Sequence, residues 1–119
     1  MAWDSKTQIM TAQSVVGTEL FSSAVTLTPK EGLKVEVQGN SDGTTDSLIV
    51  NAYGTLDDSS ENWDDVPFFT RVIDCTSGAD SKASFVIKDE YRFRIGTVRQ
   101  GSTDTITTNI WYRGDGVSI

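Results

Sequence analysis

The chain of 119 residues has the length of one domain, and its 37% hydrophobic and 23% charged residues are typical of a globular protein. Its formal net charge of −7 argues against nucleic-acid binding, which needs an electropositive face. Because the chain has no histidine and one cysteine, Cys75, it can form neither an internal disulfide nor a Cys/His zinc site, and it lacks the usual proton-transfer base.

The negative charge is concentrated in the first part of the chain. Residues 1–70 hold 3 basic and 11 acidic residues, whereas residues 71–119 hold 7 and 6. This asymmetry favours docking against a basic or mixed surface, and it equally serves solubility. The N-terminus lacks the pattern of a signal peptide, and no apolar run approaches the roughly 20 residues of a membrane span. The lone Cys75 predicts folding in a reducing cytosol and a buried, unreactive side chain.

The N-terminal third has the least regular pattern. Residues 1–8, which include Trp3, are expected to form a loose arm, and residues 9–119 the folded domain. Residues 9–16 and 24–28 indicate short strands. A helical segment over residues 14–21 is the competing interpretation of part of this region.

Alternation becomes strict in the middle of the chain. Residues 33–37 predict a strand with Lys34 and Glu36 facing water. The Gly, Asn and Asp residues of 39–46 predict a turn, and residues 47–53 predict the next strand.

A polar loop around Trp63 is predicted for residues 57–65, with a helical turn over 59–64 as the alternative. Residues 66–75 then predict another strand. Pro67 lies near its start, where a missing N–H is tolerated.

The last third shows the clearest strands, over residues 83–87, 91–95 and 105–113. In the second of these, Arg92 and Arg94 are predicted to face away from the apolar side. Together the patterns predict about seven to nine short strands, little or no helix, and thus an all-β, single-domain antiparallel β-sandwich or small barrel.

The sequence contains no recognisable catalytic motif. It has no Gly-x-Ser-x-Gly elbow, and the neighbouring pairs Ser5-Lys6 and Ser81-Lys82 lie on segments predicted to be exposed. It has neither a P-loop nor a dinucleotide-binding glycine run. We therefore expect that the protein is not an enzyme and uses no cofactor.

Acidic residues crowd the predicted loop of residues 57–65. Carboxylates of Asp57, Asp58 and Asp64 could supply oxygen ligands to calcium. Their spacing does not match an EF-hand, which also requires a glycine at its turn. We expect a solvated acidic loop without metal, with calcium as the alternative.

Two tryptophans and two arginines are candidate contact residues. Trp3 lies in the predicted arm and Trp63 in the acidic loop, where aromatic side chains serve sugar stacking or protein contact, or cover an open edge of the sandwich. Arg92 and Arg94 are expected either to pair with acidic residues across the sheet or to contact an acidic surface of another subunit.

One part of the chain resembles a known class of proteins. The segment Tyr91-Arg-Phe-Arg-Ile-Gly-Thr-Val-Arg, followed by Gly101-Ser-Thr-Asp-Thr-Ile-Thr-Thr-Asn-Ile-Trp-Tyr-Arg-Gly-Asp, is similar to the closing strand pair of small bacteriophage virion proteins, most of all head decoration (cement) proteins. The similarity covers mainly residues 83–116. It implies a jelly-roll-like sandwich that forms a homo-oligomer, a trimer or dimer, and bridges neighbouring capsomers. It transfers no catalytic residue, and only the Trp3 arm is a candidate for a capsid anchor.

We therefore expect a non-enzymatic virion structural protein, made in the host cytoplasm and located on the capsid surface. Its expected partners are the major capsid protein or other virion subunits, not nucleic acid or membrane, with Trp3, Trp63, Arg92 and Arg94 as contact residues. One alternative is a carbohydrate-binding or adhesin module, in which Trp63 and Tyr53 stack on sugar rings and the acidic loop holds calcium. The other is a tail or baseplate structural protein.

Overall fold

The computed structural model describes residues 5–27, 32–57, 62–88 and 90–114, and within these ranges the chain forms nine strands and no helix. The strands are β1 (Thr7–Val15), β2 (Leu20–Phe21), β3 (Val25–Thr26), β4 (Gly32–Ser41), β5 (Ser47–Thr55), β6 (Phe69–Ile73), β7 (Ser81–Lys88), β8 (Arg92–Gln100) and β9 (Ile106–Gly114). The predicted all-β, single-domain antiparallel sandwich is confirmed. Among the described residues, none forms a helix that could cross a membrane.

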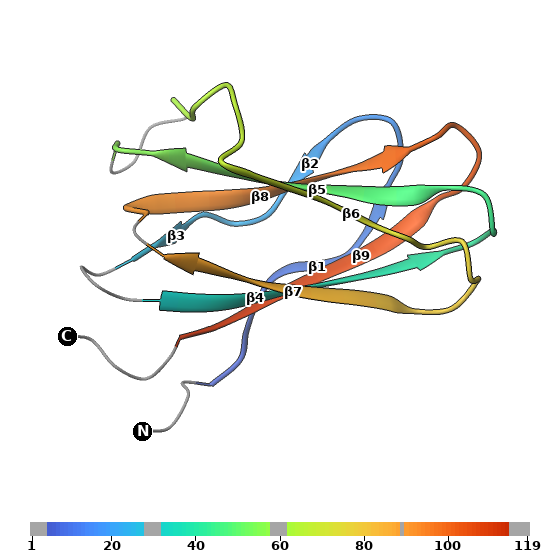
Figure 1. The fold of residues 1–119 in the computed structure, drawn as a ribbon, viewed down its shortest axis with the longest axis horizontal. Coiled ribbons are helices and arrows are strands. Elements are labelled where there is room, and N and C mark those ends of the chain that lie inside the picture. The colour runs from blue at the N-terminus through green and yellow to red at the C-terminus, as the bar shows by residue number, and fades with distance from the viewer. Residues whose placement is uncertain (1–4, 28–31, 58–61, 89, 115–119) are drawn as a thin grey trace.

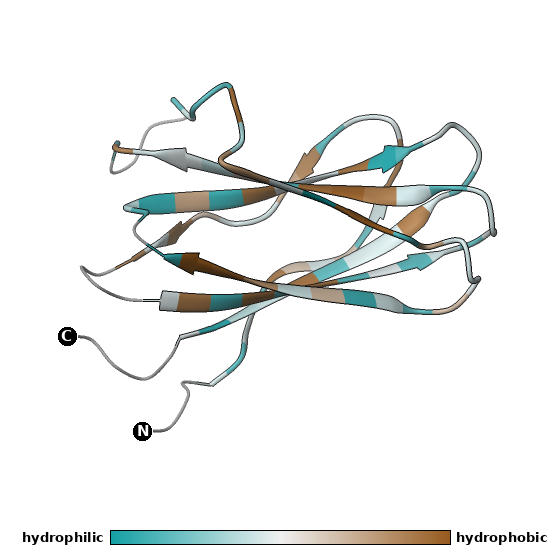
Figure 2. Cartoon of the chain, viewed as in Figure 1, coloured by the Kyte–Doolittle hydropathy of each residue, from teal (hydrophilic) through white to brown (hydrophobic). Residues whose placement is uncertain are grey.

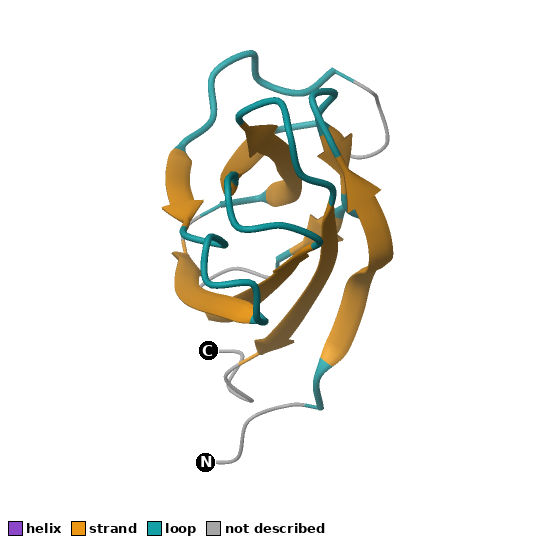
Figure 3. Cartoon of the chain, turned by 90° about the vertical axis from the view of Figure 1, so that its right-hand side faces the viewer, coloured by secondary structure: helices purple, strands orange, loops and turns teal. Residues whose placement is uncertain are grey.

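The strands form two antiparallel sheets with the orders β1-β9-β4-β7 and β2-β8-β5-β6. Both β2 and β3 pair with β8, at Leu20↔Thr97 and Val25↔Phe93, so they act as one interrupted strand. If β2 and β3 are counted as one strand, the described strands form two four-stranded sheets with the strand order of a jelly roll. Figure 1 shows the sheets as two stacked layers, and the view turned by 90° shows strands and loops only (Figure 3).

The core lies between the two inner faces because side chains alternate along each strand. In β4, Leu33, Val35 and Val37 are buried at 2% exposure or less, while Lys34 is exposed, which confirms the predicted facing. Figure 2 shows the same alternation as bands along β4 and β8. Cys75 is fully buried, as predicted, and burial raises the pKa of its thiol.

Several predicted boundaries shift in the structure. β1 begins at Thr7, so it includes the last two residues of the predicted arm, and Trp3 lies outside the described residues. The helical prediction for residues 14–21 is wrong, because β1 continues to Val15 and β2 covers Leu20–Phe21. Part of the 59–64 segment lies outside the described residues, and its remainder is not helical.

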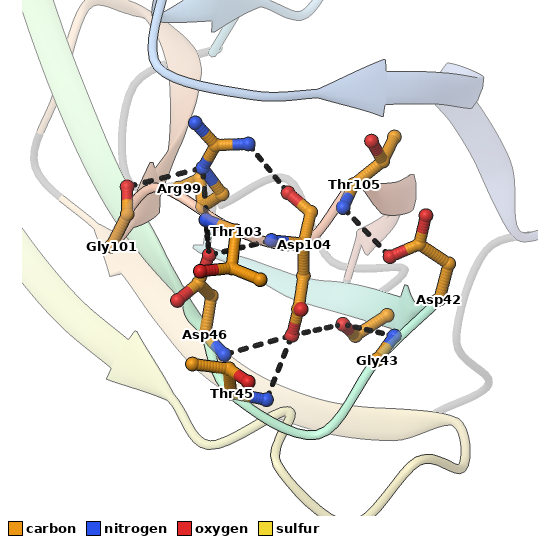
Figure 4. A network of polar contacts seen from close by, with 10 residues as sticks. Asp42, Gly43, Thr45, Asp46, Arg99, Gly101, Thr103, Asp104 and Thr105 are labelled. Atoms are coloured by element: carbon orange, nitrogen blue, oxygen red, sulfur yellow. Dashed lines mark hydrogen bonds and ion pairs between the residues drawn. The ribbon is translucent and has the colours of Figure 1, made fainter.

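Two buried aspartates fasten the β4–β5 turn to the β8–β9 turn. Asp46 and Asp104 are both 3% exposed. The Oδ2 atom of Asp104 accepts hydrogen bonds from the N–H groups of Asp46 and Thr45, at 2.8 and 2.9 Å, and from Ser41 Oγ at 2.9 Å. In return, Asp46 Oδ2 accepts the N–H groups of Thr103 and Asp104, both at 2.7 Å (Figure 4). Each carboxylate thus satisfies backbone donors of the other turn.

Arg99 and Gly101 complete this network. Arg99 Nη1 donates to the backbone oxygen of Asp104 at 2.6 Å, and its Nε lies 3.6 Å from Asp46 Oδ2. Gly101 has a φ of 117°, and a Cβ atom there would lie 2.0 Å from Asp46 Oδ1. Only glycine fits at this position, for both conformational and steric reasons.

The Asp104 network makes stability depend on pH. The hydrogen bond from the Asp46 N–H, helped by those from Thr45 and Ser41 and by nearby Arg99, holds the pKa of Asp104 below its ordinary value. The resulting stabilisation is therefore complete above about pH 4 and is lost as the pH falls through the folded-state pKa. We expect Asp104→Asn to lower the urea midpoint at pH 7 and the difference from wild type to shrink below pH 4. A constant difference across this range would contradict the assignment.

The core at Gly39 has no room for a side chain. A Cβ atom there would lie 3.0 Å from Cys75 Sγ and 3.3 Å from Ile106 Cγ2. We expect Gly39→Ala to lower the free energy of unfolding by about 1–3 kcal/mol, the usual cost of overpacking. Denaturation should show a smaller loss for Gly39→Ala in a Cys75→Ala background. Gly17→Ala is the control, because its nearest neighbour would be a flexible arginine at 3.8 Å.

Candidate functional site

The outer face of the β2-β8-β5-β6 sheet brings together the predicted contact residues Trp63, Arg92 and Arg94. In the register between β5 and β8, Tyr53 pairs with Arg94 and Gly54 with Phe93. Because Phe93 is fully buried in the core, its neighbours Arg92 and Arg94 project from the opposite face. Trp63 comes from the β5–β6 connection, which β5 holds through the hydrogen bond from Asp64 N to Gly54 O at 3.0 Å.

Arginine and aromatic side chains stack on one another at this face. Arg92 Cζ lies 4.9 Å and Arg94 Cζ 4.7 Å from the centroid of the Trp63 ring. Arg94 Cζ also lies 3.7 Å from the ring centroid of Phe21. These distances are within the range of cation–π attraction. We call Trp63, Arg92, Arg94 and Phe21 the arginine–aromatic ladder.

A hydrogen-bonded row continues from the ladder across the sheet. The Phe21 and Tyr53 rings meet in an edge-to-face arrangement, with 5.9 Å between their centroids. Tyr53 Oη donates to the Glu19 carboxylate at 3.0 Å, and Asn51 Nδ2 donates to Glu19 Oε2 at the same distance. Thr70 Oγ1 donates to Asn51 Oδ1 at 2.8 Å. Burial and the hydrogen bond to Glu19 raise the pKa of Tyr53, so it remains a neutral donor.

Arg94 does not pair with an acidic residue across the sheet. Within the part of the chain that the structure describes, it has no ion pair, and its Nε atom is buried without a hydrogen-bond partner. The predicted cross-sheet pairing is therefore wrong for Arg94, because the Trp63 and Phe21 rings occupy the faces around its guanidinium group. Arg92 contacts Trp63 and donates from Nη1 to the backbone oxygen of Asp57 at 3.4 Å.

Exposed apolar side chains lie on the same connection as Trp63. Leu56 is 89% exposed and Val66 75%, and Phe68 lies close to β5, whose Ala52 oxygen accepts the Phe68 N–H at 2.8 Å. On β6, Val72 is 48% exposed and pairs with Ile49 of β5 on the outer face. These side chains provide apolar surface that another molecule could cover.

The described residues of the acidic loop do not form a metal site. Asp58 lies outside the described residues, and those that are described contain no group of three or more acidic or Cys side chains that could hold a metal ion. Asp57 Oδ2 accepts a hydrogen bond from Asn62 Nδ2 at 3.1 Å, and Asp64 is exposed. The calcium alternative stays a prediction.

Sequence reasoning did not include Phe21 and Glu19 in the site. They reach it because β2 pairs with β8 at Phe21↔Gly96, and Gly96 leaves room for both side chains. A Cβ at Gly96 would lie 2.3 Å from Glu19 Oε2 and 3.0 Å from a Phe21 ring carbon. The only sequence signal is a glycine inside a strongly alternating strand, which marks a close approach.

Comparisons of the chain with protein-family models, with curated proteins and with solved structures find no match. The interpretation of the ladder therefore depends on its geometry.

The ladder predicts an energetic coupling between Arg94 and Trp63. A double-mutant cycle with Arg94→Ala and Trp63→Ala, measured by urea denaturation, is expected to give a coupling of about 0.5–2 kcal/mol. Arg113→Ala with Trp63→Ala is the control pair and should be additive, because Arg113 is exposed on β9 of the other sheet. Additivity of the Arg94 pair as well would contradict the ladder.

Proposed function

We propose that the chain is a non-enzymatic structural protein that docks onto other protein subunits through the outer face of the β2-β8-β5-β6 sheet. The observation that carries the proposal is the arginine–aromatic ladder, together with exposed Leu56 and Val66 on the same β5–β6 connection as Trp63. Arginine and aromatic side chains are the residues most enriched at the energetic centres of protein interfaces. Stacking also fixes the arginine rotamers in advance, which lowers the entropy lost on binding.

The more specific proposal is a decoration protein of a phage head. It is supported by the jelly-roll strand order, an architecture common among viral capsid and lectin domains. The segment that resembles cement proteins, residues 83–116, covers most of β7 and all of β8 and β9. Individually weak contacts would suffice, because an oligomer that engages many equivalent lattice sites gains affinity through multivalency.

The carbohydrate alternative is less favoured at the predicted residues. A sugar ring stacks on a free aromatic face, but Trp63 is contacted by two guanidinium groups and Tyr53 meets Phe21 in an edge-to-face arrangement. Tyr53 Oη already donates to Glu19. A tail or baseplate protein would use the same kind of docking surface, and only its position on the particle separates it from a head protein.

The test is binding to undecorated heads and to separated tails of the phage whose genome encodes the chain, followed by electron microscopy. We expect wild-type protein to occupy repeated sites on the head surface. The double variant Leu56→Ser/Val66→Ser should reduce occupancy at a fixed protein concentration by about tenfold or more. Each change replaces apolar area that docking would bury with a polar hydroxyl group.

Val86→Ser is the matched control for this experiment. Val86 is 66% exposed, comparable with Val66, but lies on β7 of the other sheet. Equal loss with the control would place the docking surface elsewhere. Absence of the protein from heads but presence on tails would support the tail or baseplate alternative, and absence from both would overturn the proposal of a virion protein.

A further inference from the structure

A second surface feature, independent of the docking face, lies on the outer face of the β1-β9-β4-β7 sheet. An open groove of about 360 Å³ is lined there by Lys6, Lys34, Glu36, Trp111 and Arg113, with Ser84 at its side. This volume is within the range of small-molecule sites. None of these residues belongs to the ladder.

The groove is basic on an acidic protein. Lys34 of β4 and Arg113 of β9 are paired in the register, and Lys6 directly precedes Thr7, which pairs with the neighbouring Tyr112. Against these three cations stands one carboxylate, Glu36, so the groove carries a local charge of about +2 in a chain of net charge −7. Such a local excess attracts an anionic group.

The pairing of Lys34 with Arg113 opposes the stability of the sheet. Like charges directly opposite on neighbouring strands are destabilising. Neither side chain has a hydrogen-bond or ion-pair partner within the ranges described, and both are exposed. An unfavourable pairing of two cations that no described contact offsets indicates that these charges serve a function.

The remaining groups of the groove suit a sugar ring. On the same outer face, Trp111 of β9 pairs with Glu36 of β4, two residues along these strands from the Lys34–Arg113 pair. Ser84 of β7 pairs with Glu36 on the opposite side of β4. The indole ring offers an apolar surface, and the carboxylate and hydroxyl offer partners for ring hydroxyl groups. Lys6 contacts Trp111 and Glu36: its Nζ lies 4.2 Å from the Trp111 ring centroid and 3.3 Å from Glu36 Oε1. Because such an exposed ion pair contributes little energy, a ligand can displace Lys6.

We propose that this groove binds a saccharide unit that carries a carboxylate, such as a uronic acid. Arg113 and Lys34 donate charge-assisted hydrogen bonds to the ligand carboxylate. Trp111 packs against the ring, and Glu36 with Ser84 binds its hydroxyl groups. A phosphate group fits less well, because its second negative charge would face Glu36, and an acidic peptide would leave Trp111 and Ser84 without a role.

The test is titration of the purified full-length chain with digalacturonate and with its uncharged methyl ester, followed by calorimetry and by NMR shifts of the Trp111 indole N–H. The acid is expected to bind and to shift this resonance, and the ester to bind at least about tenfold more weakly. Lys34→Gln and Arg113→Gln should each weaken binding of the acid by about tenfold, and Trp111→Leu should weaken it as well.

Lys82→Gln is the charge-matched control. Lys82 is exposed on β7 and pairs with Gln38, outside the groove, so its loss should leave the affinity unchanged. Circular dichroism establishes that each variant is folded. Absence of binding, equal binding of acid and ester, or equal affinity for a hexaglutamate peptide would overturn the proposal, as would an equal effect of the Lys82 variant.

Discussion

The register between β5 and β8 is the constraint on which both the core and the candidate site depend. The two strands pair over nine consecutive positions, from Ser47↔Gln100 to Thr55↔Arg92. A slip by one residue would move every side chain to the opposite face. Phe93 and Ile95, both fully buried, would then meet water, and Arg94 would enter the core. The burial of the apolar residues therefore also fixes where Arg94 meets Trp63 and Phe21.

The sequence was sufficient to predict the long strands, since half-buried strands carry a period of two that local reading detects. β4, β5, β8 and β9 were each predicted at least in part, and the outward facing of Lys34 on β4 and of Arg92 and Arg94 on β8 was predicted as well. β2 was not predicted: it is two residues long and shows no alternation, so its pairing with β8 alone defines it. The bulge in β1 was not predicted either. Ala12 adopts a φ of 43° there, and its N–H donates to Oδ1 of Asn109, almost a hundred residues away in the chain.

The candidate sites show the same division between local and long-range information. Trp63, Arg92 and Arg94 could be chosen from the sequence because a tryptophan among acidic residues and two outward arginines are visible locally. Their mutual stacking, and the contribution of Phe21, depend on which strands become neighbours. The basic groove was not predicted at all, because Lys6, Lys34 and Arg113 are far apart in the chain and meet only through the β1-β9-β4 order.

The strand order also separates rigid from interactive parts of the molecule. The β4–β5 and β8–β9 turns lie at one end, fastened by Asp46 and Asp104 (Figures 1 and 4). The β5–β6 connection with Trp63, the first residues of β4 and the last of β9 lie at the other end, where the ladder and the groove occupy opposite faces. A jelly roll built in this way can hold a protein surface with one sheet while the other remains open to a ligand. Substitutions in one face should therefore leave binding at the other unchanged. The apolar core between the sheets contains no polar connection between Arg94 and Trp111 among the described contacts.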